Sequence, residues 1–443
     1  MKATKFAAYV GIDWADRKHD VCLREKTSGK EERLVLQHSA EAIDKWAVSL
    51  QKRFAGKTVG VCLEQSKGPL IYALQKYDFL ALHPINPSTL AKYREAFSPS
   101  KAKDDPTDAE LLEELLRVHP DRLTMLRTET RETRILQFLV EDRRGLMNDK
   151  KRLGNRLTSL LKKYYPLVLE LFPKMGRTVL CKFILRWTTL EQLQAASDEE
   201  IVNFFRSHNS AQRKLLEKRL ELIHKAVPLT TDEVIISTAV LQAKTLCEQI
   251  IKHNYALEEY DREIECVYLK HPDAKIFSSL PGAGSTYGPR LLAALGTDRN
   301  RFSSAHDVQC FLGIAPVLER SGKQEWIHWR YCCSRFLRQS FHEWAGETIR
   351  RSFWAKTYYH LQRSKGKSHS IAVRALAYKW IRIVYKLWNT KTLYDESRYL
   401  DALQRSGSPL LAYINKSDGS TQTDLIELSE TEAGNAGEQP AKG

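Results

Sequence analysis

The first indication of the fold is the sequence AAYVGIDWADRKHDVCLRE, residues 7–25, whose pattern predicts two strands joined by a short polar turn. Residues 7–15 are mostly apolar and predict a strand, and residues 19–25 predict its hairpin partner. Asp13 comes at the end of the first strand, where an aspartate among apolar neighbours is unfavourable unless it is paired or liganded. The stretch therefore predicts an antiparallel pair of strands with a carboxylate at one end.

The hundred residues that follow carry one more strand and then alternate between helix and strand. The strands are short runs rich in β-branched residues, and the helices repeat an apolar residue every three or four positions. Three strands followed by this alternation predict an α/β domain, a mixed sheet with helices on its faces. The order is that of a ribonuclease H-like fold, although other α/β folds are compatible with it. The predicted strands are residues 32–38, 58–65 and 79–87, and the predicted helices are residues 39–54, 68–77, 88–97 and 104–118.

Glu64 ends a predicted strand in the same way as Asp13. If the two strands are neighbours in the sheet, both carboxylates emerge at one edge. Two anions held close together repel each other and raise each other's pKa, and a divalent cation between them removes that cost. Asp13 and Glu64 are therefore candidate ligands of a hard cation, which prefers oxygen ligands.

The sequence KAKDDPTDAELL, residues 101–112, places Asp105 and Asp108 at the start of a predicted helix. A purely structural interpretation is sufficient by itself: Asp105 caps the helix, Pro106 occupies its first turn, and Asp108 complements the helix dipole. Residues three positions apart also lie on one helix face, so both carboxylates can point at the same ion. With the two strand-end acids they make four carboxylates, a set that suits two cations in phosphodiester chemistry.

From about residue 131 the sequence becomes helical, and it stays so to about residue 400. A leucine recurs every seven residues in the first part of this region, and a second heptad pattern follows about a hundred residues later. The pattern is compatible with one arm of a coiled coil and equally with a plain helical bundle. In both structures the region would serve as a spacer or as an oligomerisation arm. The heptad positions are Leu139, Leu146, Leu153 and Leu160 in the first arm and Ile250, Leu257 and Ile264 in the second.

The C-terminal part of this helical region contains two candidate nucleic-acid contacts. In LPGAGSTYGPRLLAALG, residues 280–296, Gly282 and Gly284 lie in a turn before a helix and resemble a helix-hairpin-helix, whose backbone N–H groups can bind a phosphate. Ser321 lies in a polar turn beside Gly322, and basic side chains near it could clamp a phosphate. A serine in a turn is also an ordinary structural residue. The basic side chains are Arg320, Lys323, Arg330, Arg335 and Arg338.

The charge of the chain favours a polyanionic partner. Its formal net charge is +15, and residues 417–443 contain six acids and one lysine, so the rest of the chain carries about +20. A strongly basic body favours nucleic acid. The eight cysteines form no C-x-x-C pair, which argues against a zinc site. No run of about 18 apolar residues is evident, so we expect no membrane span and a cytoplasmic location.

Four motifs resemble those of one family of bacterial insertion-sequence transposases, the DEDD-type, bridge-RNA-guided serine recombinases. They are GIDWADRKHDV at residues 11–21, CLEQSKG at 62–68, KDDPTDAELL at 103–112 and LGIAPVLERSGKQ at 312–324. The resemblance implies a RuvC-like domain that binds Mg²⁺, or Mn²⁺, through four carboxylates. It also implies that Ser321 attacks DNA to form a phosphoserine bond, in a site that combines carboxylates of one subunit with the serine of another. The four implied metal ligands are Asp13, Glu64, Asp105 and Asp108.

The resemblance further implies the partners and the division of the chain. The expected partners are DNA of the element ends and of the target, a structured guide RNA, and further copies of the chain in a homodimer or homotetramer, associated with the nucleoid when active. In one departure from the family, YCCSRFLRQ at residues 331–339 stands where a lysine–glycine pair is common, although Arg338 still fits the final arginine. The expected parts are a RuvC-like domain at 1–125, a helical or coiled-coil region at 126–272, a mainly helical C-terminal transposase domain at 273–400 and a largely disordered acidic tail at 401–443.

Two other functions fit parts of the same pattern. A metal-dependent RuvC-type junction endonuclease would use water and would not need Ser321. A non-catalytic nucleic-acid-binding protein would need none of the acids. For the remaining residues we expect ordinary roles: His19, close to Asp13, on the surface, and the tryptophans of the C-terminal half mainly in the core, with base stacking open to Trp326 and Trp329.

Overall fold

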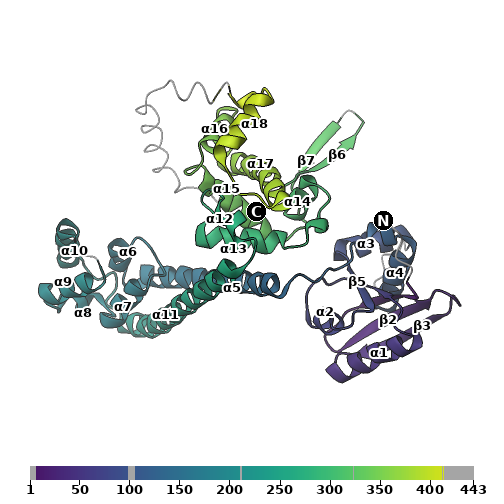
Figure 1. The fold of residues 1–443 in the computed structure, drawn as a ribbon. Helices are drawn as coiled ribbons and strands as arrows, with labels where there is room; N and C mark the ends of the chain where they lie inside the picture. Colours follow the sequence, from purple (N-terminus) through teal and green to yellow (C-terminus); the bar gives the residue numbers. More distant parts are fainter. Residues whose placement is uncertain (1–5, 98–104, 210–211, 323, 412, 414–443) are drawn as a thin grey trace. The chain divides into compact units, whose positions relative to one another are not determined.

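The structure of the chain is a computed structural model that describes residues 6–97, 105–209, 212–322, 324–411 and 413. It divides into two compact units, residues 1–128 and 129–443. Figure 1 shows the helices and strands of each unit. Unit 1 holds the predicted sheet and unit 2 is mainly helical, so the predicted combination of an α/β part and an all-α part is confirmed.

Unit 1 is built on a five-stranded mixed sheet with the strand order β3-β2-β1-β4-β5. The hairpin predicted from residues 7–25 is the antiparallel pair β1 and β2, and β3 extends it on the outer side. On the other side β1 pairs in parallel with β4, and β4 with β5, because helical crossovers return the chain to the same end of the sheet. The strands are Ala8–Asp13 (β1), Lys18–Glu25 (β2), Glu31–Gln37 (β3), Val59–Leu63 (β4) and Leu80–Pro84 (β5).

Helices cover both faces of this sheet, because alternate residues of each strand point to opposite faces. On one face Val10 and Ile12 of β1 share a hydrophobic core with α1 and α2. On the other face Cys62 of β4 packs with Leu112 of α4 and Leu90 of α3 in a second core. The helices are Ala40–Arg53 (α1), Pro69–Leu74 (α2), Pro87–Phe97 (α3) and Asp105–Val118 (α4), and a 3-10 turn follows at Pro120–Arg122.

Two long helices of unit 2, α5 and α11, run side by side (Figure 1). They contain the two predicted heptad arms, and Arg143 of α5 donates to Asp261 of α11 at 2.8 Å. Near one end of the pair, the shorter helices between them share a core with Leu157 of α5 and Leu246 of α11. The bounds are Arg131–Tyr164 (α5), Leu167–Leu171 (α6), Thr178–Arg186 (α7), Leu190–Gln194 (α8), Asp198–Ser207 (α9), Arg213–Lys225 (α10) and Glu233–Lys270 (α11).

Helix α11 corrects one expectation. By length and composition it is apolar enough to cross a membrane, whereas no such run was expected from the sequence. The run is easy to miss because Lys244 and Glu248 interrupt its apolar residues. The core helix of a protein passes the same test, but only 28% of this apolar window is buried; the buried residues of α11 pack against α5 and α7. One such helix is therefore only a weak sign of a membrane span.

The remainder of unit 2 packs around tryptophan side chains. Trp344, Trp354, Trp380 and Trp388 are fully buried in one hydrophobic core, as expected for most tryptophans of this half. Trp326 and Trp329 are exposed by 45% and 42%, so they are not part of it. The helices are Ala274–Ser278 (α12), Gly284–Leu295 (α13), Ala305–Phe311 (α14), Arg335–Thr348 (α15), Phe353–Ser364 (α16), His369–Thr390 (α17) and Glu396–Arg405 (α18), with a 3-10 turn at Arg299–Arg301.

A two-stranded hairpin interrupts these helices. The turn predicted around Gly322 is present, but its arms are strands, Val317–Ser321 (β6) and Gln324–His328 (β7). Almost every residue of the hairpin is exposed, so it lacks the apolar alternation by which a half-buried strand is recognised. Most of the acidic tail, residues 414–443, lies outside the described residues. Its predicted disorder and the four-part division of the chain stay predictions.

Candidate active site

The sheet brings two of the predicted acids to the same edge. β1 and β4 pair in parallel with Ile12 opposite Leu63, so the next residues, Asp13 and Glu64, stand side by side where the strands end. Both residues are half-buried. The condition on which the sequence argument depended, that these two strands are neighbours, is therefore met.

Helix α4 lies against the face of the sheet that carries Asp13. Gly11, two residues earlier on β1, points to the same face. A Cβ atom at Gly11 would lie 1.9 Å from the carbonyl oxygen of Ala109 and 2.5 Å from the backbone nitrogen of Glu113. Only glycine allows a helix backbone to come so close to a strand. This contact fixes the first turns of α4, including Asp108, beside the end of β1.

Asp108 is almost completely buried, with an exposed fraction of 1%. Arg94 of α3 binds both of its oxygens: Nε donates to Oδ1 at 2.7 Å and Nη2 donates to Oδ2 at 2.5 Å. This bidentate pair compensates the cost of burying the carboxylate. Asp105 is the first residue of α4, and its side chain lies outside the described part of the chain.

The chemistry of these acids fits a hard divalent cation, because carboxylate oxygens are the ligands that Mg²⁺ prefers. Within the described residues, however, no group of three or more His, Cys, Asp or Glu side chains is arranged to hold a metal ion. Asp108 gives both of its oxygens to Arg94 instead. A cation at this edge would therefore compete with Arg94 for Asp108.

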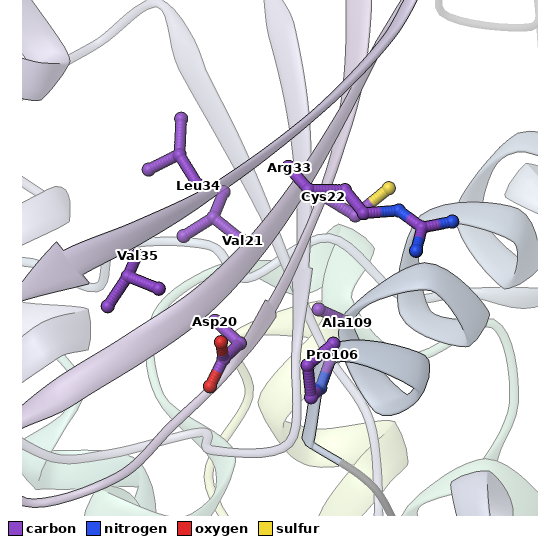
Figure 2. Close-up of a pocket in the computed structure, with 8 residues that line it drawn as sticks. All are labelled: Asp20, Val21, Cys22, Arg33, Leu34, Val35, Pro106 and Ala109. Atoms are coloured by element: carbon purple, nitrogen blue, oxygen red, sulfur yellow. The ribbon is translucent and has the colours of Figure 1, made fainter.

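Another acid, which the sequence motifs do not single out, lies at the same edge. Asp20 of β2 is directly opposite Asp13 in the antiparallel register, so the two side chains share a face of the sheet. Asp20 also lines an open pocket of about 270 Å³ that lies between β2, β3 and the first turn of α4 (Figure 2). The register of the predicted hairpin could have revealed this acid, because residues 13 and 20 pair across its turn.

His19 is not on the surface as expected. It is fully buried, and its Nε2 lies 3.0 Å from Nδ1 of His38. Burial, and then the nearby His38, lower the pKa of His19 to about 4. The ring is therefore neutral at physiological pH and serves as a core residue behind the end of β1.

Ser321 is the last residue of β6 and lies at the tip of the hairpin, paired with Gln324 across the turn. It is exposed, and Gly322 beside it has a φ of +58°, which favours glycine. Its neighbour Arg320 makes a cross-strand ion pair with Glu325, with Nε 3.0 Å from Oε2. Lys323 lies outside the described residues.

The other predicted basic residues lie at the opposite end of the hairpin. Arg330 follows β7 and Arg338 is on α15, whose exposed first residue is Arg335. A strand rises about 3.3 Å per residue, so the four steps from Val317 to Ser321 span about 13 Å. Within one subunit, Arg320 is therefore the described basic residue next to Ser321, and Arg330 and Arg338 contact each other near the hairpin base.

Gly282 and Gly284 occupy the turn between α12 and α13, with φ values of +69° and +46°. Both values lie in the left-handed region, which explains the need for glycine. Helix α13 begins at Gly284, so its first backbone N–H groups lie in this turn. This is the local arrangement on which the predicted phosphate contact depends.

Comparison with known protein families covers both parts of the chain. Residues 10–166 match the sequence model of a family described as transposase, and residues 274–360 match that of the transposase IS116/IS110/IS902 family. The chain belongs to the IS110 family of transposases. The first match includes the carboxylate edge of unit 1, and the second includes the hairpin that carries Ser321.

Several IS110-family and related proteins align with the chain. A Streptomyces coelicolor protein named as a mini-circle transposase for IS117 is 25% identical over 417 residues, which is 91% of this chain and 97% of the relative. An uncharacterized 43.6 kDa protein of insertion element IS110 from the same organism is 24% identical over 67% of this chain and 73% of its own length. An uncharacterized 42 kDa protein of insertion element IS900 from Mycobacterium paratuberculosis is 32% identical over 34% and 39%. Membership in the IS110 family implies DNA transposase activity and DNA binding.

Proposed function

We propose that this IS110-family transposase cuts and rejoins DNA through a covalent bond between Ser321 and a DNA phosphate. The Oγ atom of Ser321 forms a bond to phosphorus while the bond from phosphorus to one deoxyribose oxygen breaks. The serine proton leaves to a base, and the released deoxyribose oxygen takes up a proton. Attack on the phosphoserine by a deoxyribose hydroxyl of a second DNA end reverses the exchange and rejoins the strand.

The position of Ser321 at the tip of an exposed hairpin is the observation that carries this proposal. A serine at such a tip can approach a duplex without any rearrangement of the core. A two-stranded ribbon also has a width that the major groove of B-DNA admits. Gly322 leaves room for a close approach of the backbone, and Arg320 supplies a positive charge beside the hydroxyl.

We further propose that the four acids of unit 1 hold Mg²⁺, with Mn²⁺ as a substitute. The cation supplies positive charge that stabilises the negative charge developing on the phosphate oxygens. The strands contribute two fixed carboxylates, and α4 contributes the other two from the face that it covers. Arg94 acts as a positioning residue, because it compensates the charge of Asp108 while no cation is bound. The proposed ligands are Asp13, Glu64, Asp105 and Asp108.

A structured RNA from the same element is proposed as the guide, and a homodimer or homotetramer as the active form. The formal net charge of +15 supports a nucleic-acid partner, but charge does not distinguish RNA from DNA. RNA guidance therefore depends on the motifs shared with the family.

The decisive experiment looks for the covalent intermediate. The full-length protein is incubated with labelled DNA of its own element ends, Mg²⁺ and RNA transcribed from the same element, and adducts are separated on denaturing gels and mapped by mass spectrometry. We expect an adduct on Ser321 that is lost in Ser321→Ala and in Asp13→Asn. The matched control is Ser364→Ala, which removes another exposed hydroxyl, at the end of α16, and should leave the adduct unchanged.

The other functions give different results in the same assay. Strand cleavage by Ser321→Ala at the wild-type rate would identify a junction endonuclease that uses water. Binding without cleavage by every variant and by the wild type would identify a non-catalytic nucleic-acid-binding protein. A full yield of adduct without RNA would overturn RNA guidance and leave the serine chemistry in place.

A further inference from the structure

Three arginines from separate segments converge at the base of the hairpin, and one of them, Arg374, is not among the residues that the sequence analysis singles out. Arg374 of α17 donates from Nε to the carbonyl oxygen of Ile314 at 3.0 Å and from Nη2 to that of Gly313 at 3.4 Å. Arg330 donates to the carbonyl oxygen of Ala315 at 3.4 Å. Arg338 in turn donates to the carbonyl oxygen of Arg330 at 3.1 Å. The three side chains thus hold the segments that enter and leave the hairpin.

Trp329, the first residue after β7, lies next to two of these side chains. The guanidinium carbon of Arg374 is 3.7 Å from the centroid of the Trp329 ring, and that of Arg338 is 5.9 Å away. A planar guanidinium that stacks on an aromatic ring keeps its edge N–H groups available for other acceptors. Trp329 also stays 42% exposed, so this cluster is open to solvent.

The cluster carries an excess of positive charge among the residues that the structure describes. In the parts of the chain that the structure describes, none of the three guanidinium groups forms an ion pair with a carboxylate; the acids of the hairpin, Glu319 and Glu325, pair with other partners. All three arginines are half-buried. Burial, and then the charge of Arg338, lower the pKa of Arg374, so its charged form is disfavoured at this position. A bound anion would remove that cost.

We propose that Arg330, Arg338 and Arg374, with Trp329 as their platform, bind a phosphate of the DNA backbone other than the one that Ser321 attacks. The hairpin separates the two places by about 13 Å, because β6 rises about 3.3 Å per residue. The cluster would therefore bind the same strand a few nucleotides from the cleaved phosphate and fix the position of Ser321 along the DNA. This inference rests on the proposed function in assigning the hairpin tip to the cleaved phosphate.

A phosphodiester suits the cluster better than a single carboxylate. A guanidinium has five N–H donors, and Arg374 uses two of them on the protein backbone, so three remain for a ligand. The forked donors match phosphate oxygens in geometry. The excess of positive charge over the chain as a whole also favours a polyanion over an isolated acidic side chain.

The test measures the salt dependence of DNA binding by the full-length protein. A fluorescein-labelled duplex of the element end is titrated at several salt concentrations, and the slope of log Kobs against log salt is determined. Arg374→Ala should lower the magnitude of this slope by about 0.9, the contribution of one phosphate contact. Arg382→Ala removes an equal charge from an exposed position eight residues further along α17 and should leave the slope unchanged.

Two further measurements keep the proposal falsifiable if Arg374→Ala fails to fold. Arg338→Gln retains a hydrogen-bonding side chain and should lower the slope in the same way. In a set of duplexes, a single neutral methylphosphonate replaces one phosphate of the labelled strand at a different position in each. Wild-type binding should weaken when the replaced linkage lies a few nucleotides from the cleaved phosphate. Binding by Arg338→Gln should not be weakened by that replacement. Unchanged slopes in both folded variants would overturn the proposal.

The outcomes separate this inference from the proposed function. If Arg374→Ala lowers the slope while no protein forms an adduct on Ser321, the cluster binds DNA but the serine chemistry is wrong. If the adduct forms and the slopes do not change, the serine chemistry stands and the cluster has no such role. The same titration with RNA of the element identifies the source of the phosphate: a reduced slope for RNA alone would overturn the assignment to DNA.

Discussion

The carboxylate edge of unit 1 and the serine hairpin of unit 2 are built in opposite ways. Asp13 ends one buried central strand and Glu64 follows another, and α4 packs against the same sheet at Gly11. Ser321 stands on a two-stranded ribbon that is exposed along almost its whole length. The first site takes its geometry from a packed core, and the second takes it from the contacts at its base.

This difference predicts which substitutions change stability and which change DNA contacts. Changes in unit 1 that disturb packing should cost stability and displace the acids together. Changes on the hairpin should leave stability almost unaffected and act on DNA contacts alone. Stability measurements on variants of the two regions therefore test this difference.

The largest effect is expected at Gly11. In Gly11→Val the new Cβ would lie 1.9 Å from the carbonyl oxygen of Ala109, so α4 must move off the sheet. We expect a loss of at least about 5 kcal/mol in the free energy of unfolding, which is exceptional for a single substitution. Urea denaturation of the full-length protein measures it. In the control Gly145→Ala, nothing lies within 4 Å of the new Cβ on α5, and a gain of about 0.5–1 kcal/mol is expected.

A smaller loss is expected when the partner of Asp108 is removed. Arg94→Met leaves a carboxylate that is 1% exposed without its cation, which should cost about 3–4 kcal/mol in Mg²⁺-free buffer. If Asp108 is a metal ligand, Mn²⁺ should raise the melting temperature of Arg94→Met more than that of the wild type. Arg33→Met breaks only exposed ion pairs and should change stability by less than about 1 kcal/mol. Equal Mn²⁺ responses in Arg94→Met and wild type would argue against Asp108 as a ligand.

The smallest effect is expected on the hairpin. Ile327 of β7 is 70% exposed, so Ile327→Val should alter the free energy of unfolding by less than about 0.5 kcal/mol. The same change at Ile12 of β1, which is fully buried, should cost about 0.5–1.5 kcal/mol. Thermal unfolding of the two variants side by side is sufficient. Equal losses in the free energy of unfolding would show that Ile327 is buried in solution, by another part of the chain or by another copy of it.

The sequence is most informative where secondary structure is strongly patterned. Alternating apolar residues locate the strands of unit 1, and the ends of those strands indicate Asp13 and Glu64 as a pair. Asp20 is missed because its position depends on hairpin register, and His19 is misplaced because a buried imidazole has no sequence signal. The hairpin is missed because it is exposed on both faces. Arg374 cannot be found at all, since it contacts Ile314, before the hairpin, from a helix that lies 60 residues later in the sequence.

The contact between Gly11 and α4 has a consequence for the timing of activity. β1 is made near the beginning of the chain, and α4 is added roughly a hundred residues later. Closing so distant a contact is slow compared with forming the hairpin, because the intervening chain must be ordered first. A nascent chain that has left the ribosome only as far as β5 has the strand-end acids without their helical counterparts. Under the proposed function such a chain lacks two of its four metal ligands, Asp105 and Asp108, as well as Ser321, which is synthesised later still.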